Sequence, residues 1–132
     1  MTRCLPAALL LASLSGCGGD GPSHVTGSVT LDGRPVADGA VTFVMTGGGS
    51  DREGAVIRDG AFEVKLKPGR YRVELTGQKQ VGTRRQKGFD GKEEEVRVTE
   101  PLFPERFNTK SELVEDIKPG SNTMKFDLKS GR

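Results

Sequence analysis

Residues 55–76 read AVIRDGAFEVKLKPGRYRVELT, and this stretch decides the fold class. Apolar and polar residues alternate on either side of the dipeptide Asp59-Gly60, which is typical of strands with one buried face. Asp-Gly is favoured in two-residue hairpin turns because both residues tolerate a positive φ. The stretch therefore predicts a hairpin, and then a strand over residues 70–76 whose inward side chains are Tyr71, Val73 and Leu75.

The same pattern continues outward in both directions from this hairpin. Short alternating runs separated by glycine, proline and aspartate predict strands at 25–31, 40–45, 54–58, 61–66, 70–76, 112–117 and 123–128. With 19 glycines and 7 prolines in 132 residues, the composition favours short elements and many turns. We expect an all-β domain over residues 25–128, a seven-stranded antiparallel β-sandwich of transthyretin-like or Ig-like Greek-key type. A barrel of similar strand count is the alternative.

The segment from Gly77 to Glu95 interrupts this alternation. It is polar, with basic residues first and the run Glu93-Glu94-Glu95 at its end. Such a composition offers little apolar surface to bury, so we expect a mobile, solvated insertion at about residues 78–95. The chain then resumes a strand near 96–98, and residues 129–132 form a C-terminal tail.

The N-terminus has the pattern of an export signal. Arg3 provides a positive charge, and residues 5–14 (LPAALLLASL) form an apolar run too short to span a bilayer. The sequence therefore predicts a signal peptide over residues 1–16. An ordinary secretory signal with an incidental cysteine is the alternative.

The run Leu14-Ser15-Gly16-Cys17 resembles the lipobox of bacterial lipoproteins at every position. The resemblance implies recognition of Leu14, Ser15 and Gly16 by the signal peptidase, cleavage before Cys17, and acylation of that cysteine. Two or three acyl chains hold a protein stably on a bilayer. We expect residues 17–24 to be a flexible tether, so that the lipid bilayer is a partner through Cys17. The protein would then lie on the periplasmic face or the cell surface, with the choice of membrane left open.

A wider resemblance covers the predicted domain. Its pieces are VTGSVTLDGRPV at 25–36, GAVTF at 39–43, DGAF at 59–62 and KPGRYRV at 67–73. In this order they resemble the carboxypeptidase regulatory-like domains, which have a transthyretin-like (prealbumin-like) fold. With the lipobox, PERFN at 104–108 and IKPGSN at 117–122, the chain is similar to small planctomycete-type lipoproteins. The resemblance implies a fold and a location, and no activity.

Composition argues against several function classes. The net charge is +2, from 20 basic and 18 acidic residues, which gives no general attraction to nucleic acid. His24 is the sole histidine and falls in the expected tether, so no Ser-His-Asp arrangement is available. Cys4 and Cys17 both precede the domain, which leaves neither a disulfide framework nor a zinc site. We expect no enzyme activity, no metal and no cofactor.

Four residues are candidate interface positions. Phe103 and Phe107 lie in irregular chain, where an aromatic side chain is available to a partner, and Arg84 and Arg85 belong to the charged insertion. Calcium binding by Asp90 with residues 93–95 is the weaker alternative, because three consecutive carboxylates point in different directions.

These features suggest a membrane-anchored, exported lipoprotein with a non-catalytic sandwich for binding, adhesion or envelope structure. An accessory subunit of an envelope transport or secretion assembly, and a glycan- or calcium-binding module, are the alternatives. An envelope protein or a glycan is the expected partner beyond the bilayer.

Overall fold

The computed structural model describes residues 21–131 of the chain. The predicted signal peptide at 1–16 and its residues Leu14, Ser15 and Gly16 lie outside the described residues, as does Cys17. Those predictions therefore stay predictions.

The described chain is all-β, with one short 3₁₀ helix. Its elements are β1 (Ser23–Leu31), β2 (Arg34–Pro35), β3 (Asp38–Met45), β4 (Arg52–Arg58), β5 (Ala61–Leu66), β6 (Gly69–Thr76), β7 (Gln78–Lys87), β8 (Glu93–Pro101), η1 (Glu105–Phe107), β9 (Val114–Ile117) and β10 (Ser121–Leu128). The seven predicted strands correspond to β1, β3, β4, β5, β6, β9 and β10. His24 lies in β1 and not in a tether, because the strand begins at Ser23.

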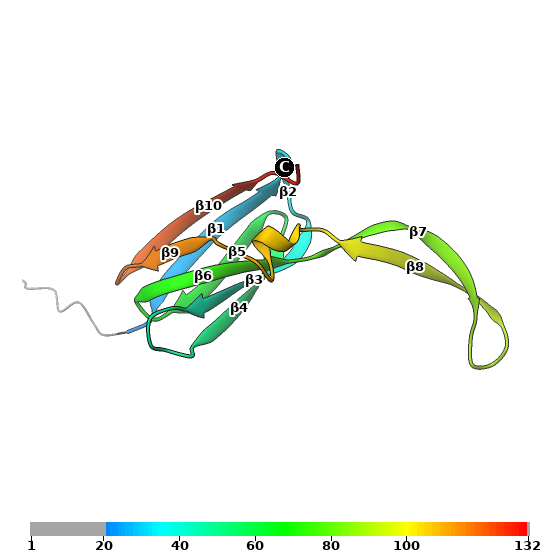
Figure 1. Cartoon of the computed structure of the whole chain (residues 1–132), viewed down its shortest axis with the longest axis horizontal. Helices are drawn as coiled ribbons and strands as arrows, with labels where there is room; N and C mark the ends of the chain where they lie inside the picture. Colours follow the sequence, from blue (N-terminus) through cyan, green and yellow to red (C-terminus); the bar gives the residue numbers. More distant parts are fainter. Residues whose placement is uncertain (1–20, 132) are drawn as a thin grey trace, which may run out of the picture.

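The strands form a sandwich, which confirms the predicted fold class. Their pairing order is β10-β1-β5-β4-β3-β6-β9, with β2 beside β1. The β5 and β4 strands pair only through Arg58 and Ala61 at their shared turn, so the sheet folds over there into two layers (Figure 1). Within residues 21–131 no pairing joins β9 to β10, so the path stays open.

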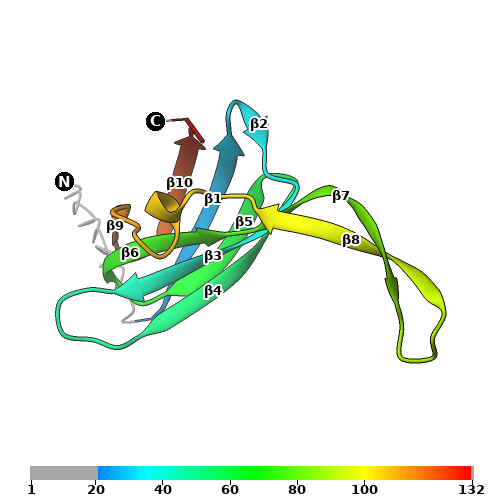
Figure 2. The same cartoon turned by 45° about the vertical axis from the view of Figure 1, so that its right-hand side comes forward.

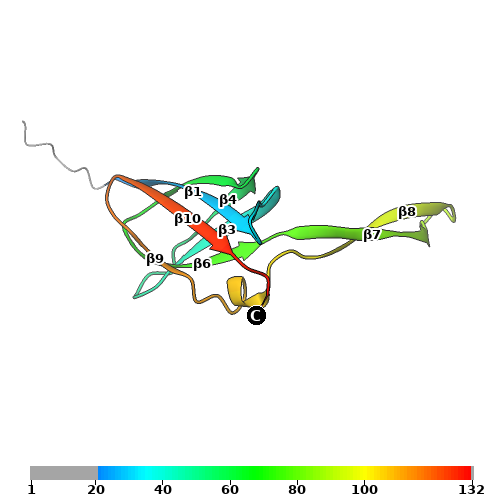
Figure 3. The same ribbon diagram turned by 90° about the horizontal axis from the view of Figure 1, so that it is seen from above.

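One strand pair departs from the antiparallel prediction. β10 lies parallel to β1 along its whole length, from His24 opposite Ser121 to Leu31 opposite Leu128. Parallel strands need a long connection between them, and here nearly the whole domain separates the two. The first and last long strands of the domain therefore lie side by side in one layer of the sandwich (Figure 3).

The core lies between the layers and consists of the alternating residues that the sequence indicates. Buried side chains include Val25 and Val29 of β1, Val41 and Phe43 of β3, Ile57, Phe62, Val64, Leu66, Tyr71, Val73, Leu75, Met124, Phe126 and Leu128. Four aromatic rings form a row in the order Tyr71, Phe43, Phe62, Phe126, with neighbouring centroids 5.9–6.2 Å apart. The Tyr71 hydroxyl donates to the Lys67 carbonyl at 2.9 Å, so this buried phenol is satisfied.

The predicted Asp-Gly hairpin is confirmed by its backbone. Asp59 and Gly60 have φ of 50° and 77°, the left-handed conformation that a type I′ turn requires. Asp32 and Gly33, with φ of 52° and 80°, repeat this geometry between β1 and β2.

The start of β1 and the exit from β6 lie at opposite ends of the sandwich. Ser23 pairs with Leu66 at the end of β5, and its hydroxyl donates to the Lys118 carbonyl at 2.7 Å. At this end the side chain of Asn122 closes the 118–122 turn, accepting from the Lys118 amide and donating to its carbonyl. The chain leaves the far end of the sandwich after Thr76 (Figure 1).

The segment expected to be a mobile insertion is instead a two-stranded hairpin, which corrects that prediction. β7 and β8 pair with each other and with no strand of the sandwich. The hairpin extends well clear of the sandwich and is here called the arm, residues 78–101 (Figure 2). It is also longer than the interval 78–95 proposed for the insertion.

Candidate binding arm

The root of the arm is closed by a backbone hydrogen bond between the two residues that flank it. The Leu102 amide donates to the Gly77 carbonyl at 2.9 Å, so the two ends of the arm lie side by side. Gly77 also leaves little room at this point, because a Cβ there would lie 3.2 Å from the Leu102 side chain. The arm is therefore a hairpin inserted between two residues, Gly77 and Leu102, that are neighbours in space.

The two strands of the arm carry opposite charges. The basic residues of β7 are Lys79, Arg84, Arg85 and Lys87, whereas the acidic residues of β8 are Glu93, Glu94, Glu95 and Glu100. Opposite charges directly face each other at Lys79 with Glu100, Arg85 with Glu95, and Lys87 with Glu93. Exposed cross-strand pairs of this kind stabilise by at most about 0.2–1 kcal/mol each. Within the described residues the ion pair between the two strands joins Arg85 diagonally to Glu93, at 3.9 Å.

The arm has no core of its own. Every side chain of β7 is exposed, and only Val96 and Val98 of β8 are half-buried. The pairing shifts by one residue between Gln80 and Gly82, a bulge that leaves Val81 unpaired and 48% exposed. A lone two-stranded hairpin is marginally stable in water. The arm therefore exposes both faces and both edges to solvent, and its side chains add nothing to the core of the sandwich.

The tip of the arm carries an aromatic side chain. Between β7 and β8, the Gly88 amide donates to the Lys92 carbonyl at 2.8 Å and the Gly91 amide donates to the Gly88 carbonyl at 3.0 Å. The Lys92 amide also donates to Asp90 Oδ1 at 3.1 Å. This turn holds Phe89 outward, and the ring is fully exposed to solvent. An exposed aromatic ring offers a large apolar area that a partner can bury.

Sequence reasoning missed Phe89 as a candidate. The signal that could have found it is an aromatic residue between two glycines, GFDG at 88–91, within an otherwise polar segment. The predicted residues Arg84 and Arg85 do lie on the arm, on opposite faces because they are consecutive in β7. Arg84 faces Val96 and Arg85 faces Glu95 across the ribbon.

Phe103 is placed where it cannot contact a partner, which corrects its selection as an interface residue. Its side chain is 4% exposed and belongs to the hydrophobic core. The prolines on either side of residues 102–103 made this stretch look like surface chain, but the chain turns inward there. Phe107 is half-buried against the same core, and the Arg106 guanidinium lies 4.7 Å from its ring centroid.

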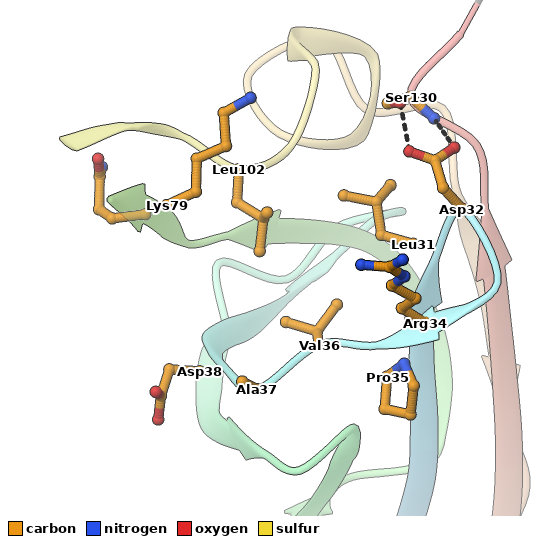
Figure 4. Close-up of a pocket in the computed structure, with 11 residues that line it drawn as sticks. Leu31, Asp32, Arg34, Pro35, Val36, Ala37, Asp38, Lys79, Leu102 and Ser130 are labelled. Carbon is orange, nitrogen blue, oxygen red and sulfur yellow. Dashed lines mark hydrogen bonds between the residues drawn. The ribbon is translucent and has the colours of Figure 1, made fainter. Parts of the chain in front are cut away.

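A groove lies at the root of the arm, beside the β1–β2 turn (Figure 4). Its volume is about 630 Å³, and Leu31, Val36 and Leu102 provide apolar walls. Arg34 from β2 and Lys79 from β7 extend into or over it. Within the described residues neither cation forms an ion pair.

The C-terminal tail is held at one side of this groove. Asp32 accepts hydrogen bonds from the side chain and the backbone amide of Ser130, the latter at 2.9 Å. These two bonds, the side-chain one first, lower the pKa of Asp32 below its ordinary value. Arg106 donates to the carbonyls of Lys129 and Gly131. The tail is thus ordered, and the Asp32 carboxylate is already occupied.

An ion cluster centred on the buried carboxylate of Glu74 lies on the outer face of the layer that contains β6. Glu74 of β6 is 8% exposed, and its two carboxylate oxygens accept from Arg52 at 2.8 Å and from Arg72 at 2.7 Å. Both arginines remain partly exposed, so the cluster is a structural feature of the sheet surface.

No metal-binding geometry is evident within residues 21–131. No group of three or more His, Cys, Asp or Glu side chains there is arranged to hold a metal ion. Glu93, Glu94 and Glu95 alternate between the two faces of β8, as their order implies. His24 Nε2 lies 2.5 Å from Glu63 Oε1 on the neighbouring strand, at the surface of the sandwich. In this part of the chain no helix has the length and apolarity to cross a bilayer.

Comparisons with known proteins add one distant likeness. No protein-family model matches the sequence, and no curated protein matches it. A crystal structure of a DUF3823 family protein from Parabacteroides merdae is similar, with a TM-score of 0.41 and 18% identity. The match covers 84% of this chain and 46% of that one, so this chain spans less than half of its length.

Proposed function

We propose that the protein is a non-catalytic binding module, held on the bacterial envelope by an acylated Cys17, whose recognition element is the arm. The sandwich serves as a rigid base, and the arm presents Phe89 to a protein partner. The resemblance to planctomycete-type lipoproteins with a carboxypeptidase regulatory-like domain belongs to the same proposal.

The observation that carries the proposal is the full exposure of Phe89 at the tip of an arm that adds nothing to the core. An apolar ring in water is unfavourable by about 1.5–3 kcal/mol relative to its burial. A partner that covers the ring gains that free energy.

The direction of the arm supports a partner away from the anchoring membrane. The described chain begins at Gly21, four positions after Cys17, and enters β1 at the end of the sandwich opposite the arm (Figure 3). A lipid at Cys17 would hold that end near the bilayer and leave the tip pointing outward. The tip is also poorly suited to anionic lipid, since residues 84–95 carry four basic and four acidic side chains and so have no net positive charge.

Site-specific photo-crosslinking in intact cells tests this proposal. A photoreactive phenylalanine analogue at position 89 is expected to give a discrete adduct with a protein. The matched control places the same analogue at the exposed position Lys125 on β10, where no adduct of that size is expected. Equal labelling at both positions, or none at position 89, contradicts the proposal.

A further inference from the structure

The tip of the arm combines an apolar ring with two carboxylates. A Cβ at Gly88 would lie 2.9 Å from Glu94 Oε1 and 3.1 Å from Asp90 Oδ1, so both carboxylates converge on the residue before Phe89. Asp90 has Lys92 nearby at 3.7 Å, whereas Glu94 forms no ion pair within the described residues. The tip is narrow because glycine stands at both 88 and 91.

The groove at the root of the arm has the complementary chemistry. Its walls are apolar at Leu31, Val36 and Leu102, and Arg34 and Lys79 stand at it without ion-pair partners in the described chain. Of its two acidic residues, Asp32 is bound to Ser130, which leaves Asp38 as the free carboxylate. At about 630 Å³, the groove is large enough for a phenyl ring with its flanking backbone.

The arm is extended, so its tip cannot reach the groove at its own root (Figure 2). Ten residues of β7 span about 33 Å at ~3.3 Å per residue. Tip and groove lie at the two ends of one arm. Two arms lying side by side in opposite directions would therefore bring each tip to the other's root.

From this complementarity we infer that the protein docks onto a second copy of itself, with Phe89 of each chain in the groove at the root of the other arm. The inference rests on the proposed function of the arm and names its partner. The arrangement is isologous and closes at two copies.

Sedimentation equilibrium of the full chain in detergent, at one chain per micelle or fewer, measures this association. The wild type is expected to form dimers and no larger species. Phe89→Ala is expected to weaken dimerisation at least about tenfold, since both buried aromatic contacts of the symmetric interface are lost. Phe89 contacts nothing in the monomer, so circular dichroism should be unchanged.

A charge exchange makes the test specific. One variant carries Arg34→Glu with Lys79→Glu, and the other carries Asp90→Asn with Glu94→Lys, where asparagine keeps the acceptor for the Lys92 amide. Each variant alone sets like charges against each other at both contacts and is expected to stay monomeric. Their equimolar mixture restores attraction at both contacts and is expected to form a dimer.

The outcomes separate this inference from the proposed function. A wild type that stays monomeric, or a mixture that does not dimerise, overturns the inference. If position 89 nevertheless crosslinks to a different protein in cells, the arm is still a recognition element and only its partner is wrong. If position 89 gives no adduct at all, both fail.

Discussion

The ring of Phe62 on β5 lies directly over the backbone of Gly27, its opposite neighbour on β1. A Cβ at position 27 would lie 2.3 Å from the Phe62 ring. The aromatic ring thus fills the space that the glycine leaves in the strand and stacks on Phe126 at 6.2 Å. Gly27→Ala is expected to lower the free energy of unfolding by about 1–3 kcal/mol, because it overpacks the core. Chemical denaturation measures this, with Gly82→Ala on the open arm as the control expected to change little.

Truncation to alanine should lower stability strongly at Phe103 and hardly at all at Phe89. Phe103→Ala is expected to destabilise the domain by about 3–5 kcal/mol, since its ring is in the core. Phe89→Ala should change stability by less than about 0.5 kcal/mol, because an exposed side chain loses no packing. Thermal denaturation of both variants at low protein concentration provides the comparison. A large effect from Phe89 and a small one from Phe103 would reverse the assignment made from burial.

The cluster at Glu74 should contribute to stability, unlike an exposed pair. Glu74→Gln weakens charge-assisted hydrogen bonds to Arg52 and Arg72 and is expected to cost about 1–2 kcal/mol, limited by the exposure of both arginines. Glu63→Gln, which affects the exposed pair with His24, is the control and should cost under about 0.5 kcal/mol. Urea denaturation at pH 7 distinguishes them. Equal losses would mean that the burial of Glu74 contributes nothing.

Low pH should weaken the contact between the neighbouring strands β1 and β10. The Thr30 hydroxyl donates to Asp127 at 2.8 Å and is the main cause that lowers the pKa of this carboxyl below its ordinary value. A lowered pKa in the folded state gives stability that is present above the unfolded pKa and lost as pH falls through the folded one. Thr30→Val is therefore expected to flatten the decline of unfolding free energy below about pH 4. An unchanged acid limb would contradict this.

The sequence predicted the sandwich well because its information there is local. Alternation and the dipeptide Asp59-Gly60 specify which side chains face inward and where the chain reverses, and the φ angles confirm the turn. The parallel placement of β10 beside β1 depends on contacts about a hundred residues apart, which no local pattern encodes.

The candidate site was harder to predict, for two physical reasons. The strands of the arm bury no apolar face, so neither has the apolar alternation by which strands are recognised. Phe103 lies between prolines and still turns into the core, because the segment after the arm must return to the sandwich at Gly77. Arg84 and Arg85 were identified from charge alone, without the hairpin that positions them.

In the proposed function, the sandwich provides stability and the arm provides recognition. Because Leu102 and Gly77 are hydrogen-bonded neighbours, residues 78–101 can be replaced by Asn-Gly, which favours a tight turn. Chemical denaturation of this shortened chain, at a concentration where the full chain is monomeric, measures the contribution of the arm directly. The account predicts an unfolding free energy within about 1 kcal/mol of the full chain. Loss of cooperative unfolding, or a fall of several kcal/mol, would show that the arm is part of the folded core and would contradict the claim.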